Sequence, residues 1–356
     1  KRYFDVSALV LWEWYYSPAY MHLGHETVTA SLTDDEIDAL RARFWKHDEI
    51  LTWLKQHGVN SNWDMVHAHM VVTLWLMLEA YTKDHGPIDV VLRTPDDVQY
   101  LGSLLHDYDV PSASHVMRRL INVVPDRAGK DDVFTYLSNA VSSSLGTASR
   151  QWTPLDSPLW QLHFEAFQAW YFGDTLYAQT YQKPPYAKGK EGFLRREEPL
   201  GTAAGIRHMF QELKRRGYEI AIATGRSQME MQIPFETYHW LEEFNPTYTA
   251  TYTDVEAASK QLGMSLDKPN PFAYYLGAFG KFPQQYRAYT ERPDDFKKGT
   301  YYVVGDSLAD VWCAKVMGAV MIGTLTGLDG QAARAMFEKE HVDYIVDSVE
   351  DILKIL

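Results

Sequence analysis

Residues 196–356 alternate between short apolar runs and segments of helical spacing, and this alternation limits the possible folds more than any other feature. Apolar runs such as "YEIAIAT" and "TYYVVGD" end at polar residues or glycine, and helical segments such as "LADVWCAKVMG" separate them. Strands that alternate with helices build a parallel β-sheet with helices on both faces. We therefore predict an α/β fold for this part of the chain, with a Rossmann-like parallel sheet as its core.

The segment between residues 33 and 187 has a different pattern, with apolar residues at helical spacing and no alternating strands. The run "LTDDEIDALRARFWKHDEILTWLKQHG" opens with a Thr-Asp capping signal and closes at a glycine. The run "NWDMVHAHMVVTLWLMLEAYTKDHG" has a similar form. Such start and stop signals bound amphipathic helices. This part of the chain is predicted to form a large all-α domain.

The run "SALVLWEWYYSP", residues 7–18, is the most apolar part of the N-terminal segment. A short continuous apolar run of this kind is consistent with a strand that is buried on both faces. We expect this strand to join the parallel sheet and to end at the carboxylate of Glu13. The chain is then predicted to form two domains, an α/β core from residues 1–17 and 196–356 and a helical domain from residues 18–195.

The composition argues against several classes of partner. A formal net charge of -13 argues against nucleic acid and anionic membrane surfaces, because both select basic faces. Cys313 is the single cysteine, which excludes an internal disulfide, and the longest apolar run, residues 70–78, is too short to span a bilayer. We expect a cytoplasmic protein that binds a small molecule. The sequence does not indicate its oligomeric state.

Polar residues follow the predicted strands at their carboxyl ends, where parallel sheets carry their chemistry. Thr224 and Gly225 come after "YEIAIA" and precede a helix, which suits an oxyanion such as phosphate. Asp306 and Asp310 come after "TYYVVG" and can converge on a hard cation such as Mg²⁺. Lys268 stands in "DKPNP", where a fixed ammonium group can neutralise a phosphate. Each feature alone is common in turns and helix caps, but their order along successive strands indicates a site.

Together these segments resemble the haloacid dehalogenase superfamily, and most closely its phosphoglycolate-phosphatase-like branch, whose members have an α-helical cap. Thr224 matches the second motif of that family, Lys268 the third, and the segment "GDSLAD", residues 305–310, the fourth. The resemblance covers residues 200–356, and the helical segment matches only by its position as an insert. It implies a Mg²⁺-dependent hydrolase that acts on a small phosphomonoester.

The first motif of the family, a strand that ends in Asp-x-Asp-x-Thr, is atypical in this chain. Aligning "VLWEWYYSP" with it puts Glu13 at the nucleophile and Tyr15 at the second aspartate, where dehalogenases of the superfamily carry a tyrosine. An extra methylene moves the attacking oxygen, and a displacement of about 1 Å can cost ~10²-fold in rate. In a rival alignment, Asp5 is the nucleophile.

The resemblance implies a role for each candidate residue. The carboxylate of Glu13 attacks phosphorus to give an aspartyl- or glutamyl-phosphate type of intermediate, and Glu13, Asp306 and Asp310 hold Mg²⁺. Thr224 and Lys268 stabilise the transferred phosphoryl group. Two alternatives stay open: a catalytically impaired relative that binds a ligand or a partner through its cap, and a dehalogenase-like hydrolase of non-phosphate substrates.

Overall fold

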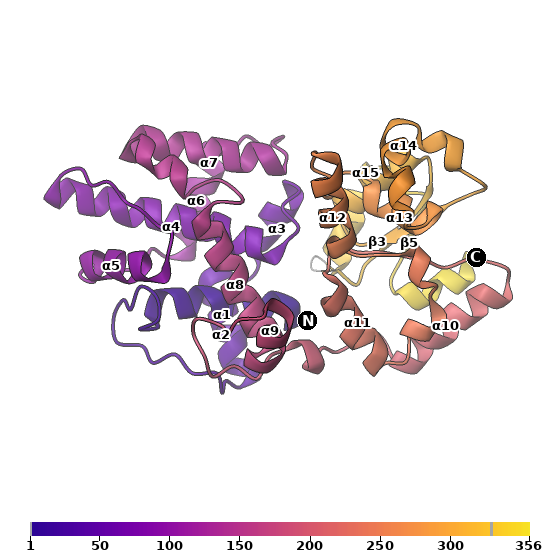
Figure 1. Cartoon of the computed structure of the whole chain (residues 1–356), viewed down its shortest axis with the longest axis horizontal. Coiled ribbons are helices and arrows are strands. Elements are labelled where there is room, and N and C mark those ends of the chain that lie inside the picture. The colour runs from indigo at the N-terminus through magenta and orange to yellow at the C-terminus, as the bar shows by residue number, and fades with distance from the viewer. Residues whose placement is uncertain (1, 328–329) are drawn as a thin grey trace. The chain divides into compact units, whose positions relative to one another are not determined.

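In the computed structural model, which describes residues 2–327 and 330–356, the chain divides into two compact units (Figure 1). Residues 1–197 form a helical unit and residues 198–356 form an α/β unit, so the boundary lies close to the predicted one. The predicted fold class, a Rossmann-like parallel core together with a large helical domain, is confirmed. One assignment is corrected: residues 1–17 belong to the helical unit and not to the α/β core.

Helices make up the described secondary structure of the first unit. They are α1 (Arg2–Tyr16), α2 (Asp34–Trp45), α3 (Glu49–Gln56), α4 (Asn62–His85), α5 (Pro95–Leu105), α6 (Ala113–Val123), α7 (Lys130–Leu145), η1 (Thr147–Gln151), α8 (Pro158–Phe172), α9 (Asp174–Tyr181) and η2 (Leu194–Arg196). Thr33 and Thr94 start α2 and α5 with capping boxes. In each box the threonine hydroxyl accepts a hydrogen bond from the amide three residues later, and the carboxylate of that residue accepts one from the threonine amide. No helix in the described part of the chain is both long and apolar enough to cross a membrane.

The strand predicted over residues 7–18 is wrong, because these residues form most of α1. This helix packs against α2, α4 and α8, and its side chains from Asp5 to Tyr16 are all buried. A helix that is buried on all sides has apolar residues all round and shows no helical periodicity. Its sequence therefore cannot be distinguished from a buried strand by periodicity alone.

The α/β unit contains five described strands, each close to a predicted apolar run. They are β1 (Ile222–Ala223), β2 (Thr249–Ala250), β3 (Tyr302–Gly305), β4 (Val320–Thr324) and β5 (Tyr344–Val346). Its helices are α10 (Ala203–Arg215), α11 (Gln228–Thr237), α12 (Tyr252–Leu262), α13 (Phe272–Phe279), α14 (Tyr286–Glu291), α15 (Leu308–Met317) and α16 (Ala333–Lys339), and the 3₁₀ turn η8 (Val349–Lys354) follows β5.

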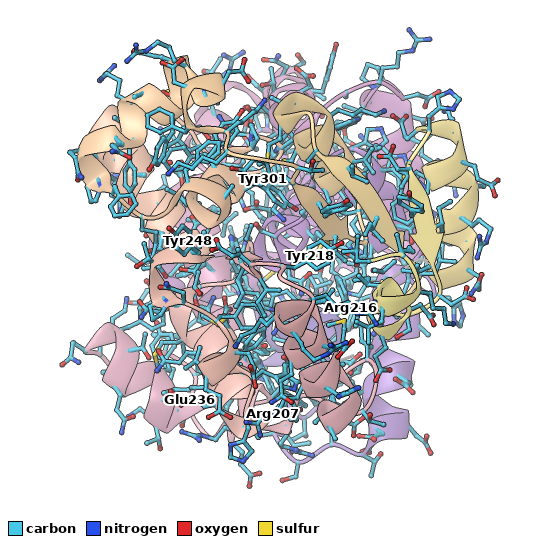
Figure 2. All side chains as sticks on the ribbon, turned by 90° about the vertical axis from the view of Figure 1, so that its right-hand side faces the viewer. Arg207, Arg216, Tyr218, Glu236, Tyr248 and Tyr301 are labelled. Atoms are coloured by element: carbon cyan, nitrogen blue, oxygen red, sulfur yellow. The ribbon has the colours of Figure 1, made fainter. Side chains whose placement is uncertain are left out.

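The strands pair in parallel, as predicted, but in two sheets. Strand β1 pairs with β2, and β3, β4 and β5 form a second sheet in that order. Figure 2 shows this unit with Tyr218, which precedes β1, labelled near its middle, and with the arrows of the three-stranded sheet to one side. Among the described residues, no strand pairing joins the two sheets.

The run "PFETYHWLEEF", residues 234–244, has apolar residues at helical spacing and predicts a helix, but the helix in the structure begins earlier. Ser227 caps α11 and forms a capping box with Glu230, so the helix starts at Gln228 and ends at Thr237. Pro234 lies inside the helix and not at its start. The capping box supplies partners for the first free amides, and it decides where the helix begins.

Candidate functional site

The carboxyl end of β3 leads directly into α15 and carries the first part of the site. Ser307 caps α15 and forms a capping box with Asp310. The Oδ2 atom of Asp310 accepts hydrogen bonds from the amides of Asp306 and Ser307, both at 3.1 Å, and from the Ser307 hydroxyl at 2.9 Å. The Asp310 side chain thereby fixes the turn that presents Asp306.

Lys268 and Tyr274 approach the other oxygen of the same carboxylate. Oδ1 of Asp310 accepts a hydrogen bond from Nζ of Lys268 at 2.9 Å and one from the Tyr274 hydroxyl at 2.6 Å. Nζ of Lys268 also donates to the Tyr274 hydroxyl at 3.0 Å and lies 4.7 Å from the centre of that ring. Five donors therefore converge on Asp310. Lys268 is one of them, and its ammonium group is held by Oδ1 of Asp310 and the Tyr274 hydroxyl.

The charges of this cluster stabilise one another. Burial alone would raise the pKa of Asp310, but the charge of Lys268 and hydrogen bonds from Tyr274, Lys268 and Ser307 outweigh it and lower the pKa to about 2. Burial alone would lower the pKa of Lys268, but the charge of Asp310 holds it above its usual value. Burial and the Asp310 charge raise the pKa of Tyr274, which stays a neutral donor. At neutral pH the cluster is an ion pair with a hydroxyl bridging it.

Two glycines allow this close packing. A Cβ atom on Gly305 would lie 2.4 Å from Oδ2 of Asp310, and one on Gly327 would lie 2.2 Å from Oδ2 of Asp306. Both separations are far inside van der Waals contact, so a larger residue would displace a carboxylate. The backbone itself therefore forms part of the wall around both aspartates.

Thr224 and Gly225 follow β1 in the same unit, as predicted. The Thr224 amide donates to the carbonyl of Ala250 on β2, and its hydroxyl accepts a hydrogen bond from the amide of Arg226 at 3.1 Å. Gly225 is exposed and precedes the Ser227 cap of α11. A hydroxyl and a backbone amide thus stand at the carboxyl end of β1, just before a helix.

Glu13 lies elsewhere, inside the helical unit. Its carboxylate forms an ion pair with Lys190 at 2.7 Å and accepts a hydrogen bond from Nε1 of Trp170 at 2.9 Å. The side chains of Glu13 and Lys190 are 4% and 2% exposed. Burial raises the pKa of Glu13, against the opposing charge of Lys190. The alignment that makes Glu13 the nucleophile and a metal ligand depends on a strand over residues 7–18, where the structure has α1 and an enclosed carboxylate.

Tyr15 and Asp5 are also enclosed by the helical unit. The Tyr15 hydroxyl donates to Oγ1 of Thr73 at 3.0 Å and lies 3.2 Å from Nδ1 of His69, and burial raises its pKa. Oδ1 of Asp5 lies 2.7 Å from Nη1 of Arg41, and Asp5 is fully buried. Both side chains connect helices of this unit.

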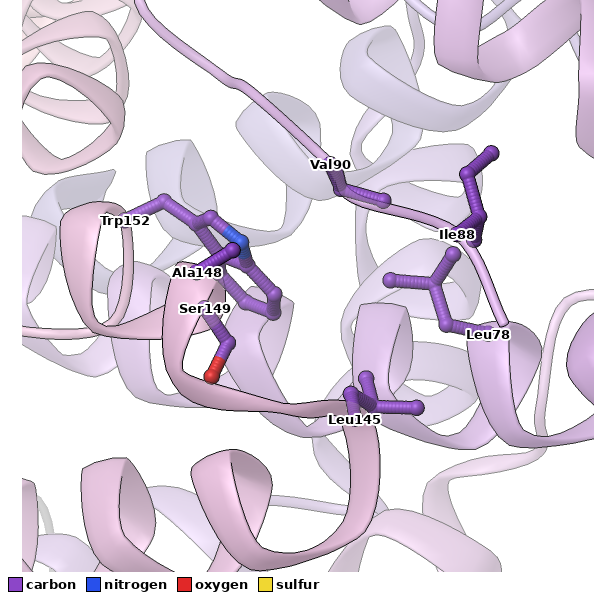
Figure 3. Close-up of a pocket in the computed structure, with 7 residues that line it drawn as sticks. All are labelled: Leu78, Ile88, Val90, Leu145, Ala148, Ser149 and Trp152. Atoms are coloured by element: carbon purple, nitrogen blue, oxygen red, sulfur yellow. The ribbon is translucent and has the colours of Figure 1, made fainter.

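A small hollow lies in the helical unit (Figure 3), and it has a different character. Its lining residues are Leu78, Ile88, Val90, Leu145, Ala148, Ser149 and Trp152. They include no side chain that titrates, so the hollow offers neither an acid nor a base to a bound molecule.

Two comparisons with known proteins found matches to this chain. Residues 266–352 match the HAD-hydrolase-like family, a segment that includes Lys268, Asp306 and Asp310. An X-ray structure of a Northeast Structural Genomics Consortium target is 31% identical, with a TM-score of 0.78, over 99% of this chain and 94% of that one. The chain belongs to the haloacid dehalogenase superfamily. No curated protein sequence matches it.

Haloacid dehalogenase-like hydrolases generally use Mg²⁺, and the described residues provide one suitable ligand for it. Among those residues, no group of three or more His, Cys, Asp or Glu side chains is placed to hold a metal. Mg²⁺ usually keeps several waters and binds through one or two carboxylates together with a substrate phosphate. Asp306 is a carboxylate of this kind at the end of β3, and both oxygens of Asp310 accept hydrogen bonds, one of them from Lys268.

Tyr274 is the member of the cluster that sequence reasoning missed. It lies in the apolar helix α13, "FAYYLGAF", where an aromatic residue is expected to fill the core. Nothing in that pattern distinguishes it from Tyr275, which is buried one position later. Only the three-dimensional structure brings its hydroxyl to Asp310.

Proposed function

We propose that the protein is a Mg²⁺-dependent hydrolase of a small phosphomonoester. The observation that carries this proposal is the ion pair between Lys268 and Asp310 at 2.9 Å, beside Asp306 at the end of β3. A lysine held by a carboxylate, next to a second carboxylate that can serve as a hard oxygen ligand, suits a phosphate group that carries two negative charges.

Each residue of the site has a role in this proposal. The ammonium group of Lys268 has three hydrogens, of which Asp310 and Tyr274 accept two, and its side chain is 19% exposed. The third hydrogen is left for a phosphate oxygen. The hydroxyl of Thr224 and the amide of Gly225 donate to the same phosphoryl group from the end of β1. Asp306 would hold Mg²⁺, which neutralises charge on that group when bound.

The family resemblance implies a two-step reaction. A carboxylate oxygen attacks phosphorus, the bond from phosphorus to the ester oxygen breaks, and the leaving oxygen takes a proton from water to give the alcohol. Water then attacks the acyl phosphate, releases inorganic phosphate and restores the carboxylate. Lys268 holds the phosphoryl oxygens through both steps, and Asp310 and Tyr274 hold Lys268.

Hydrolysis of a panel of phosphomonoesters, with and without Mg²⁺, tests the proposal. Lys268→Ala and Asp306→Asn are expected to lower kcat by roughly 10²-fold or more, because each removes a group that stabilises the transition state. Lys315→Ala is the matched control, because Lys315 lies on α15 in an exposed pair with Glu340. A rate that survives Lys268→Ala would refute the assignment.

Glu13→Gln gives a second test of where the chemistry occurs. Glutamine keeps the shape of Glu13 and an acceptor for Trp170, and the side chain is enclosed. We expect the hydrolysis rate of this variant to match that of the wild type, provided that circular dichroism shows it folded. A folded variant without activity would return the nucleophile to the first 17 residues.

One observation favours a second candidate function, a catalytically impaired relative that binds a ligand or partner through its helical unit. Both N-terminal carboxylates, Glu13 and Asp5, are committed to buried ion pairs. The absence of turnover with every ester, with and without Mg²⁺, in a folded protein would favour this candidate. The dehalogenase-like alternative depended on Tyr15 alone, and that side chain bridges helices.

A further inference from the structure

The hollow of the helical unit lies where two of its long helices end. Helix α4 ends at Gly86 and α7 ends at Gly146, and both glycines have positive φ angles, of 86° and 92°. Glycine adopts such angles without steric cost, and they turn the chain sharply at the end of a helix. The chain after α4 runs without helix or strand up to Thr94, and the chain after α7 forms the turn η1. These two segments form two sides of the hollow, and Nη2 of Arg93 joins them by donating to Oε1 of Gln151 at 3.0 Å.

The hollow has a buried floor and an apolar rim. Leu78, Ser149 and Trp152 form the floor and are 1%, 4% and 1% exposed. The rim consists of partly exposed apolar side chains, those of Ile88, Val90, Leu145 and Ala148. The space between these walls, its mouth included, is about 230 Å³. A molecule that enters the hollow must therefore be small, and most of its surface must be apolar.

Trp152 supplies a polar group to this floor. Figure 3 shows its indole along one wall, with the nitrogen on the side of the hollow. Its backbone is already bonded, because the amide donates to the Ser149 carbonyl and the carbonyl accepts from the Ser157 hydroxyl at 3.2 Å. Within the described parts of the chain, no hydrogen bond is found for Nε1 of Trp152. A buried indole N–H group usually has a partner, so this donor is available to a molecule in the hollow.

A water molecule would satisfy this donor poorly. A buried water typically makes about three hydrogen bonds. The lining side chains offer it one donor, Nε1 of Trp152, and one acceptor, the hydroxyl oxygen of Ser149, whose hydrogen goes to the Gly146 carbonyl at 2.8 Å. The rest of the lining is aliphatic. A molecule with one acceptor oxygen on an apolar body can use the same donor, and it also gains from the burial of its carbon atoms.

We propose that the hollow binds a small neutral molecule with an aliphatic body and one uncharged acceptor oxygen, which accepts a hydrogen bond from Nε1 of Trp152. The aliphatic side chains of the floor and the rim contact the body of this molecule. An ionised molecule is excluded, because burying a charge is costly unless an opposite charge pairs with it, and the lining side chains carry none. The site belongs to the helical unit alone, so its test is independent of the proposed hydrolysis.

The indole N–H signals in the NMR spectrum of the whole chain test the proposal, with cyclopentanone as the probe. The chain has 11 tryptophans, and Trp152→Phe identifies the signal of Trp152 by its loss. We expect cyclopentanone to shift that signal in a saturable way and to leave the other indole signals in place. Cyclopentanecarboxylate has the same ring with a charge, and it should cause no shift. A response that does not saturate, that spreads over several indoles, or that is equal for both compounds overturns the proposal.

Two substitutions separate the space from the donor. Ala148→Leu fills the hollow and should abolish the saturable shift, whereas Thr147→Leu, at an exposed position of the same turn outside the lining, should keep it. Trp152→Phe keeps an aromatic wall without the donor and should weaken binding by roughly 3- to 10-fold, measured on the signals of cyclopentanone itself. Unchanged affinity in Ala148→Leu or in Trp152→Phe overturns the proposal. If Trp152→Phe does not fold, Ala148→Leu decides, because it keeps the indole.

Discussion

Asp310→Asn is expected to destabilise the α/β unit by about 2 to 4 kcal/mol at pH 7. The pKa of Asp310 falls from 3.8 to about 2, which corresponds to ~2 kcal/mol of stability by linkage. The rest comes from geometry. Asparagine has one oxygen and one NH₂ group, but both oxygens of Asp310 accept hydrogen bonds, so either orientation directs a donor at other donors. An unsatisfied buried group costs a further ~1–3 kcal/mol.

Urea unfolding measures this loss, with hydrogen exchange of residues 302–324 as the probe because it reports the α/β unit alone. Asp294→Asn is the control: Asp294 is 83% exposed in its pair with Lys297, and such pairs contribute about 0–1 kcal/mol. The folded pKa of Asp310 is depressed, so its contribution is present above pH 4 and is lost as the pH falls towards 2. An Asp310→Asn variant within about 0.5 kcal/mol of the wild type would refute this account of the cluster.

Two further predictions concern groups that the fold keeps uncharged or paired. Burial lowers the pKa of His67 and of His69 to about 4, so the stability of the helical unit should be full above pH 6.5 and fall between pH 6.5 and 4. Tryptophan fluorescence in urea at pH 7.5 and 5.0 measures this, and equal stability would contradict it. Tyr274→Phe removes a hydrogen bond to the charged Asp310 and should lower stability by about 1.5–3 kcal/mol. The urea midpoint of the α/β unit measures this loss, and an unchanged midpoint would show that the Tyr274 hydroxyl does not contribute to holding Asp310.

The parallel strands and most helices could be predicted from local sequence because their signals are local. Apolar runs such as "YYVVG" end at glycine or at a capping residue, and Ser307 with Asp310 starts α15 through contacts within four residues. The order of strands and helices then places Thr224 and Asp306 at strand ends of one unit, and Lys268 in the loop before α13 of the same unit. Where two nearby signals competed, as at Pro234 and the Ser227 capping box, the position of α11 was predicted wrongly.

The sequence alone therefore determined the alternation of strands and helices and the helical unit, because periodicity and caps act over a few neighbouring positions. It also proposed Lys268, Asp306 and Asp310 as candidate site residues. Only the tertiary structure decided that residues 2–16 form a helix, since a helix buried on every side has no periodicity to read. It also decided that Glu13 pairs with Lys190, 177 positions later, and that Tyr274 reaches Asp310. Such contacts depend on how distant segments pack together, and no pattern of neighbouring residues encodes that packing.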